Sequence, residues 1–303
     1  MTDRLTILGC SWVDGLPFVR VIEADSSNSE LRPLLGLHLG YRTEPEAVRT
    51  CLGHRPFRGD RTYVDCRQRP LPGKRVCRSC AIVEATFASN LHHAHTKDDV
   101  GLDPAIAAHL RQPNLLYLAA FRDGSVKVGT STENRHRTRL AEQGAWMAQV
   151  VAWASDGITV RLLEDWVTDR LGLAQAISSN RKLEGFERPR TDEDLQHLLD
   201  THREQVHRLM TLDRDPDLLR PLERSWRHPR ADTERWSSLH RYPADLRSGS
   251  HDLDVIDACG RMILLRRPGG PDRFVADLQQ LYGRELEFGA FGSEPLTVQD
   301  SLF

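Results

Sequence analysis

Four of the six cysteines in this chain lie between residues 51 and 80, and this clustering constrains the fold more than any other feature. Cys77 and Cys80 form a C-x-x-C pair, and Cys51 and Cys66 precede them in a stretch that contains several prolines and glycines. A C-x-x-C pair can direct two thiolates at one metal ion, and two further cysteines would complete a tetrahedral site. Because the segment shows little apolar periodicity, we predict that a structural Zn²⁺ ion takes the place of a hydrophobic core.

The ligand set leaves alternatives open. His54 follows Cys51 at metal-ligand spacing and could replace one thiolate. Three histidines further along the chain are weaker candidates: His92, His93 and His95. The alternatives to a metal site are plain buried thiols and a redox C-x-x-C pair, although a redox pair is expected near a β-α-β pattern, and Cys77 does not lie in one. The two other cysteines lie in strand-like segments and are expected in the core: Cys10 and Cys259.

Composition sets the class of protein. The chain has 303 residues, of which 39% are hydrophobic and 28% charged, as is ordinary for a globular protein with two or three domains. No apolar run approaches the roughly 20 residues of a membrane-spanning helix, so we expect no membrane partner. The first residues carry an acid and then a short apolar run, unlike a secretory signal, so we expect a cytoplasmic protein whose thiols stay reduced.

Charge is uneven along the chain, although the net charge is only -2. The cysteine segment contains two acids, Asp60 and Asp65, among many basic residues: Arg55, Arg58, Arg61, Arg67, Arg69, Lys74, Arg75 and Arg78. Such a patch can bind the phosphates of DNA or RNA, or it can be a solvated surface with counterions. The chain as a whole is not a generic polyanion binder.

Apolar periodicity and turn residues predict a compact α/β domain after the cysteine segment. The expected order is a β-hairpin, a helix, a strand and a second helix: strands at 115–121 and 126–130, a helix at 133–143, a strand at 147–154 and a helix at 158–171. Gly144 and Gly172 each follow a predicted helix, as C-terminal capping glycines do.

The remaining regions complete an α+β protein. Residues 1–50 and 251–303 read as strands, and Thr191 with Asp194 opens an amphipathic helix that precedes a charged, proline-rich linker. We therefore expect five parts: a β-rich region at 1–50, a cysteine-rich zinc-binding segment at 51–100, an α/β domain at 101–190, a helical region with a linker at 191–250, and a β-rich region at 251–303.

Short motifs in the α/β domain carry a resemblance to the GIY-YIG nuclease domain. They are Tyr117-Leu118-Ala119, Lys127-Val128-Gly129-Thr130, Arg139-Leu140 and Gln143-Gly144-Ala145. More closely, residues 116–145 resemble a family of bacterial proteins of unknown function that joins a cysteine-rich zinc segment to a GIY-YIG-like domain. The upstream residues that fit this family are Cys51, Gly53, Cys66, Cys77 and Cys80. The resemblance implies a zinc-ribbon-like segment followed by a GIY-YIG-like fold.

The resemblance also implies a site. In GIY-YIG nucleases, tyrosines, a helix arginine and a glutamate that holds a divalent metal ion cleave a phosphodiester. Carried onto this chain, these roles fall on Tyr117, Arg139 and Glu164, with Mg²⁺ or Mn²⁺ at Glu164, and the motif glycine is Gly129. Lys127 stands where the second tyrosine is expected, and its ammonium could bind phosphate or act as a base.

The same residues also have purely structural interpretations. Tyr117 could be a core residue, Arg139 and Glu164 ordinary helix charges, and Gly129 a residue that lets the strand leave the hairpin. The leading hypothesis is a zinc-containing protein that engages nucleic acid or another phosphate-bearing ligand, in its most concrete form a metal-dependent nuclease. The alternatives are a catalytically inactive scaffold that binds protein or nucleic acid, and an enzyme acting on a small nucleotide-like substrate.

Overall fold

The computed structural model describes residues 3–56, 62–92, 104–211, 218–237 and 239–293. Five positions named above lie outside these residues: Arg58, Asp60, Arg61, His93 and His95. The side chain of His92 lies outside them as well. In the described part of the chain, no helix has the length and apolar character needed to cross a lipid bilayer.

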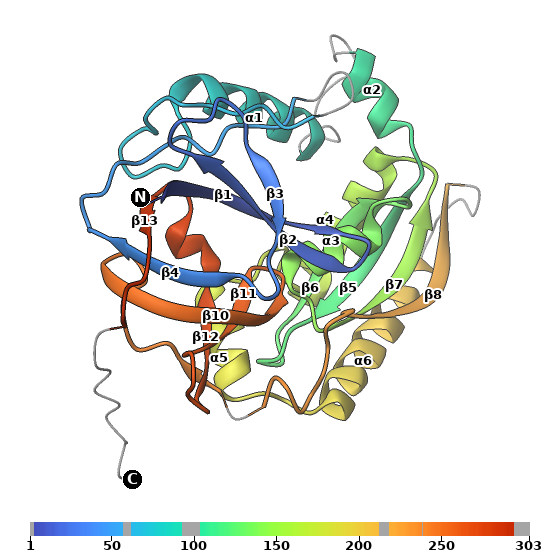
Figure 1. Cartoon of the computed structure of the whole chain (residues 1–303). Coiled ribbons are helices and arrows are strands. Elements are labelled where there is room, and N and C mark those ends of the chain that lie inside the picture. The colour runs from blue at the N-terminus through green and yellow to red at the C-terminus, as the bar shows by residue number, and fades with distance from the viewer. Residues whose placement is uncertain (1–2, 57–61, 93–103, 212–217, 238, 294–303) are drawn as a thin grey trace.

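A nine-stranded sheet unites the two β-rich ends of the chain. Its strands are β1 (Asp3–Val13), β2 (Leu16–Glu23), β3 (Glu30–Pro33), β4 (His38–Thr43), β9 (His240–Arg241), β10 (Gly249–Cys259), β11 (Met262–Arg266), β12 (Arg273–Asp277) and β13 (Glu285–Phe288). The order is β3-β2-β1-β13-β4-β10-β11-β12-β9, so β13 pairs with both β1 and β4. The sequence predicted strands at both ends, and the structure joins them in one sheet (Figure 1).

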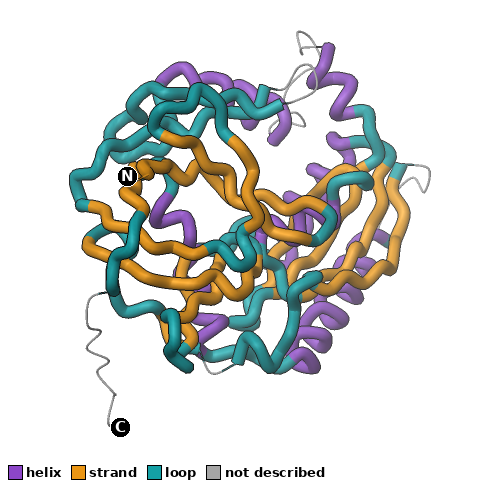
Figure 2. Tube along the Cα trace, in the orientation of Figure 1, coloured by secondary structure: helices purple, strands orange, loops and turns teal. Residues whose placement is uncertain are grey.

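The cysteine segment lies beside β1 and β3 at one end of this sheet (Figure 1). Its last part is a helix that the sequence interpretation did not include, α1 (Arg78–His92). The rest of the described segment is almost wholly loop, as Figure 2 shows. Hydrogen bonds fasten it to the sheet, for example from Ser29 N, directly before β3, to Asp65 Oδ2 at 2.7 Å.

A four-stranded antiparallel sheet with flanking helices forms the second half of the molecule. Its strands are β5 (Asn114–Ala120), β6 (Val126–Thr132), β7 (Met147–Ala154) and β8 (Leu219–Arg227), in the order β6-β5-β7-β8. The helices are α2 (Pro104–Leu110), α3 (His136–Gln143), α4 (Gly157–Leu171), α5 (Ser179–Glu187) and α6 (Asp192–Met210). A short 3₁₀ helix, η2 (Leu278–Leu281), follows β12.

The predicted order of hairpin, helix, strand and helix is confirmed at residues 114–171. Gly144 and Gly172 both have a φ of 67° in the left-handed region, as capping glycines should. Thr191 accepts a hydrogen bond from Asp194 N at 3.1 Å and so begins α6 as predicted.

Two expectations differ from the structure. The helix predicted from residue 133 begins at His136, because residues 133–135 form a turn in which Thr132 Oγ1 donates to Asn134 Oδ1. The stretch predicted to be a linker contains strand β8, which pairs with β7 along most of its length. β8 is mostly exposed and charged, so backbone pairing forms it where apolar periodicity gives no signal.

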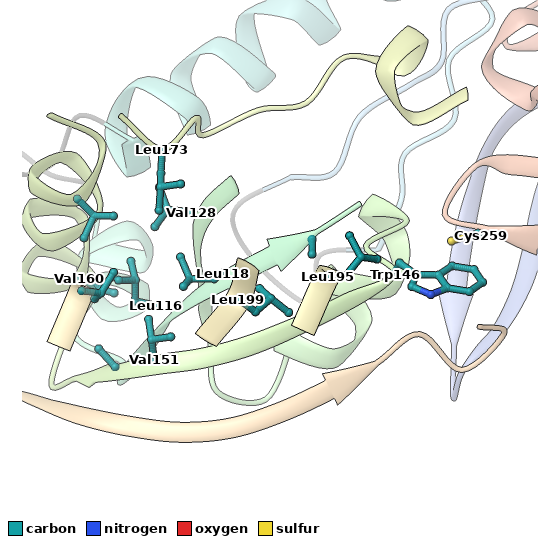
Figure 3. Packing of buried hydrophobic residues seen from close by; sticks show 14 of the residues in the cluster. Leu116, Leu118, Val128, Trp146, Val151, Val160, Leu173, Leu195, Leu199 and Cys259 are labelled. Atoms are coloured by element: carbon teal, nitrogen blue, oxygen red, sulfur yellow. The ribbon is translucent and has the colours of Figure 1, made fainter. Parts of the chain in front are cut away.

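The main core covers one face of the four-stranded sheet, where the strands meet α4 and α6 (Figure 3). Side chains from these elements pack together there: Leu116, Leu118, Val128, Val160, Leu195 and Leu199. The other face carries Tyr117 and packs against Leu140 of α3. The end of α3 meets the turn between β10 and β11 so closely that a Cβ on Gly260 would lie 2.6 Å from Gly144 N. This contact brings the face with Tyr117 next to the nine-stranded sheet.

Candidate functional site

The four clustered cysteines converge on one point. Their Sγ atoms, from Cys51, Cys66, Cys77 and Cys80, all lie within 4.8 Å of one another. The Sγ atoms of Cys66 and Cys77 are 3.8 Å apart. Tetrahedral coordination with Zn–S bonds of about 2.3 Å requires sulfur atoms about 3.8 Å apart, whereas a disulfide requires about 2.05 Å. The four cysteines are unpaired, and their arrangement could hold a metal ion.

Backbone geometry supports this cluster. Cys51 Sγ accepts hydrogen bonds from Gly53 N at 3.4 Å and Cys77 N at 3.1 Å. Gly53 has a φ of 72°, and a Cβ there would lie 2.3 Å from Val64 O. Only glycine therefore allows residues 54 and 64 to pair as they do. Hydrogen bonds from the neighbouring backbone, that of Cys80 foremost, lower the pKa of the Cys77 thiol to about 7, which favours the thiolate that binds metals.

His54 lies beside the cluster and contacts one of its sulfurs. Its Nδ1 is 3.2 Å from Cys80 Sγ, at hydrogen-bonding distance. The group of side chains that could share one ion consists of the four cysteines, and His54 is not in it. In the structure, His54 is therefore a hydrogen-bond partner of a ligand candidate, a position that commonly orients a metal ligand.

Tyr117 and Lys127 lie on the same face of the β5–β6 hairpin. Tyr117 pairs with Gly129 across the strands, and Lys127 pairs with Ala119 two residues along. Lys127 Nζ is 5.9 Å from the centroid of the Tyr117 ring. A Cβ on Gly129 would lie 2.6 Å from Tyr117 Cζ, so the glycine makes room for the tyrosine ring. Gly129 therefore has a packing role beside Tyr117.

The Tyr117 hydroxyl is buried and hydrogen-bonded from α3. It accepts a hydrogen bond from Gln143 Nε2 at 2.9 Å. Burial raises the pKa of Tyr117, while the nearby guanidinium of Arg139 acts in the opposite direction. Arg139 itself is exposed, so it lies at the solvent side of this group. The structure thus brings Arg139 near Tyr117 without burying it.

Lys127 is a buried cation whose charge is poorly compensated. It is 8% exposed, and its Nζ donates a hydrogen bond to Gln175 O at 3.0 Å. Burial lowers the pKa of Lys127 to about 8, and Arg139 lowers it further while Glu164 opposes the shift. Lys182, which the prediction did not assign to this site, donates to Gln143 O at 2.7 Å. Burial also lowers the pKa of Lys182 to about 8.

Glu164 is buried at 3% exposure and paired within its own helix. Arg161 Nη1 lies 2.5 Å from Glu164 Oε2. The carboxylate acts on the pKa values of both Tyr117 and Lys127, so it lies within electrostatic range of them. Of the four predicted residues, three are buried and Arg139 is exposed, and the carboxylate has an arginine partner that the prediction did not include.

The predicted basic patch is divided in the structure. Arg67 donates to Glu23 O at 2.8 Å and so fastens the segment to β2. Arg69 and Lys74 line a depression of about 340 Å³, whereas Arg55 lines a different one beside α3. The basic residues of the described segment therefore line at least two different depressions.

Comparison with known proteins identifies a family but no characterised relative. Neither the curated proteins nor the solved structures contain a match to this chain. A family model described as "Protein of unknown function (DUF2797)" matches residues 56–228. The matched region spans three of the four clustered cysteines and the whole four-stranded sheet. Because it covers more than half of the chain, this protein belongs to the DUF2797 family.

Proposed function

We propose that this protein is a zinc-containing, GIY-YIG-like protein that binds a phosphate-bearing ligand, in the first place nucleic acid, and hydrolyses a phosphodiester with the help of Mg²⁺ or Mn²⁺. The proposal is supported by the position of Tyr117 and Lys127 on one face of the hairpin, 5.9 Å apart, where the charges of Arg139 and Glu164 act on the pKa values of both. Burying a lysine and a carboxylate costs free energy unless they pair or bind something. Among the described residues, the ammonium of Lys127 has a backbone hydrogen bond and a ring contact but no ion pair, which suits a group that receives an anion.

Zn²⁺ is the metal that best suits the cysteine cluster. Four thiolates in tetrahedral arrangement are typical of structural zinc, and such a closed site leaves no position for a substrate. The ion would hold the loops of the cysteine segment together rather than take part in chemistry. His54 would hydrogen-bond one thiolate and orient it.

Each residue around Tyr117 has a role in the proposed reaction. Arg139, which is exposed to solvent, would offset negative charge that develops on the phosphate. Lys127 would bind a phosphate oxygen in the place of a second tyrosine. Glu164 would hold the divalent ion that stabilises the leaving oxygen, for which Arg161 must give up its ion pair with that carboxylate.

An inactive binding protein is the second candidate, and one observation favours it. Arg161 already neutralises Glu164, as expected of a structural ion pair. The two candidates differ in what the loss of Glu164 does to stability. In a structural pair, removing the carboxylate leaves Arg161 unpaired and should cost about 3–5 kcal/mol.

Cleavage of labelled DNA and RNA with Mg²⁺ or Mn²⁺ tests the proposal. Wild type is compared with Glu164→Gln and with Asp169→Asn, which removes an exposed carboxylate of the same helix. We expect Glu164→Gln to lower the rate at least about 100-fold while thermal stability stays close to that of wild type. Asp169→Asn should leave both unchanged. Absence of metal-dependent cleavage in the wild type, with Glu164→Ala strongly destabilised, would support the inactive scaffold instead.

A further inference from the structure

A basic groove lies where three parts of the chain meet. Two adjoining depressions, of about 370 and 320 Å³, share Arg20 of β2, Arg55 of the cysteine segment, and Arg135 and Glu142 at the two ends of α3. Tyr63, also from the cysteine segment, lines the larger depression. These five residues define the basic groove. Three guanidinium groups face a single carboxylate there, so the groove carries positive charge.

Arg20 is held in place without a counter-charge. Its guanidinium lies 4.4 Å from the centroid of the Tyr63 ring, and its Nη1 donates to Ser29 Oγ at 3.0 Å. Among the residues that the structure describes, no carboxylate forms an ion pair with Arg20. A stacked arginine keeps N–H donors in its plane for a further acceptor, so Arg20 is oriented to receive a phosphate.

The groove continues toward the face with Tyr117. Arg135 and Arg139 are four residues apart along the turn and helix α3, so they lie on the same side of it. Arg135 forms an ion pair with Glu142 at 3.2 Å but stays 41% exposed, and Arg139 is exposed as well. An anion that follows these two guanidinium groups along α3 moves from the basic groove to the neighbourhood of Tyr117.

We propose that the basic groove binds the phosphate backbone of single-stranded nucleic acid and leads the strand toward Tyr117. The inference rests on the proposed function, since it names the substrate class of the same site. A groove of a few hundred Å³ has the size of a ligand pocket, which a flexible single strand can enter. A double helix is wider than its major groove, which by itself spans about 12 Å. A duplex would therefore contact only the rim of the basic groove.

The cysteine cluster supports one wall of this groove. Arg55 and Tyr63 flank the isolated bridge between His54 and Val64, a few residues from Cys51 and Cys66. Metal binding would hold this wall of the groove in place, while Arg20 and Arg135 stand on elements outside the segment. Loss of the metal should therefore weaken nucleic-acid binding without changing the other two arginines.

Fluorescence anisotropy of labelled (dT)12 and (U)12 tests the proposal on the full chain. Arg20→Gln, Arg55→Gln and Arg135→Gln are compared with Arg208→Gln, which removes an exposed arginine of α6. We expect each groove variant to weaken binding about 10-fold and to lower the slope of log K against log salt concentration by about 0.7, the value for one phosphate contact on a single strand. Arg208→Gln should bind as wild type does, and Cys77→Ser should bind weakly.

Three results would contradict the proposal that the basic groove binds single-stranded nucleic acid. They are absence of single-strand binding at low salt, equal effects of Arg208→Gln and the groove variants, and equally tight, equally sensitive binding of a duplex of the same length. Circular dichroism confirms that each variant is folded, and a misfolded variant is replaced by the lysine substitution, which keeps the charge and should retain most binding.

Hydrolysis of bis(p-nitrophenyl) phosphate separates this inference from the proposed function. The small diester reports on the reaction alone, and Glu164→Gln should abolish its hydrolysis whatever the groove variants do to oligonucleotide binding. If Glu164→Gln abolishes hydrolysis but the groove variants bind oligonucleotides normally, the groove is wrong and the reaction stands. If the groove variants lose binding but the wild type hydrolyses no phosphodiester, the groove stands and the reaction is wrong.

Discussion

The cysteine segment and the four-stranded sheet hold their shapes by different means. In the cysteine segment, the buried cluster consists of Cys51, Cys77 and Cys80, with only Cys66 and Val76 packed against them. In the four-stranded sheet, strands and helices share a large apolar core that extends to the nine-stranded sheet. One region thus depends on a few polar ligands, and the other on many apolar contacts. A single substitution should therefore have very different consequences in the two regions.

The two regions also differ in the kind of polar group that they bury. The thiols of the cysteine segment meet one another, as ligands of a shared ion do. Lys127 and Glu164 belong to the domain built on the four-stranded sheet, called the sheet domain below. Both are buried without sharing an ion pair with each other. A structural site satisfies its own ligands, whereas a site for a substrate keeps charge that the substrate must balance.

The largest effect is expected from Cys77→Ser. Metal binding supplies the folding free energy of such a segment, about 10–16 kcal/mol for zinc-finger peptides, so loss of one ligand should unfold it. Zinc content, measured by elemental analysis, should fall from about one ion per chain to nearly none. Cys10→Ser is the matched control, since Cys10 lies outside the cluster, and it should keep the zinc. Full zinc content in Cys77→Ser would remove the distinction between the two regions.

Leu163→Ala should be the next largest change, and it affects the other region. Leu163 is fully buried in the core between α4 and the four-stranded sheet. Its truncation leaves a cavity and should lower the free energy of unfolding by about 2–5 kcal/mol, measured by urea denaturation. Zinc content should not change. Leu162→Ala, at a 49% exposed neighbour, should cost far less. A loss of zinc in Leu163→Ala would show that the two regions fold as one unit.

Lys127→Met tests whether the sheet domain stores an uncompensated charge. The pKa of Lys127 falls from its ordinary 10.5 to about 8, so the folded protein loses this proton before the unfolded chain does. The cost of the buried charge is fully present below pH 8, at most about 3 kcal/mol, and disappears as pH rises from 8 to 10.5.

The variant should therefore be more stable than wild type at pH 7, and thermal melts should show the difference shrinking toward pH 10. Lys74→Met, at an exposed lysine, should show no such trend. If Lys127 also binds the ligand, affinity should fall as pH rises through about 8. If the difference in thermal stability between wild type and Lys127→Met did not depend on pH, burial of the charged lysine would not destabilise the folded protein.

The smallest effect is expected at the start of the helix that carries Glu164. Asp156 Oδ1 accepts hydrogen bonds from Ile158 N at 2.8 Å and Thr159 N at 2.7 Å and so caps α4. Asp156→Ala should cost about 1 kcal/mol, and Asp156→Asn much less, because asparagine is also a good cap. Urea denaturation measures both. If Asp156→Ala also abolished zinc binding, local changes in the sheet domain would reach the cysteine segment.

Prediction from the sequence succeeds where the cause is local. Gly144, Gly172 and Thr191 mark helix ends because capping depends on backbone angles and on one nearby side chain. It fails at β8, whose pairing with β7 depends on a strand distant in the sequence. It also did not place Gln143 at the Tyr117 hydroxyl or Lys182 at Gln143 O, since the fold alone brings α3 and α5 together there.

Two features of the candidate sites can be predicted from local sequence. The spacing of Cys77 and Cys80 is enough to predict a metal ligand pair, because two thiolates three residues apart can reach one ion. The alternation of β5 and β6 is enough to place Tyr117 and Lys127 on one face. Tertiary structure alone decided that Arg161 neutralises Glu164, that Arg139 stays exposed, and that Arg20 and Arg55 meet α3 in one groove. These relations join segments far apart in the chain, and only packing of the two sheets and the cysteine segment sets the distances between their charges.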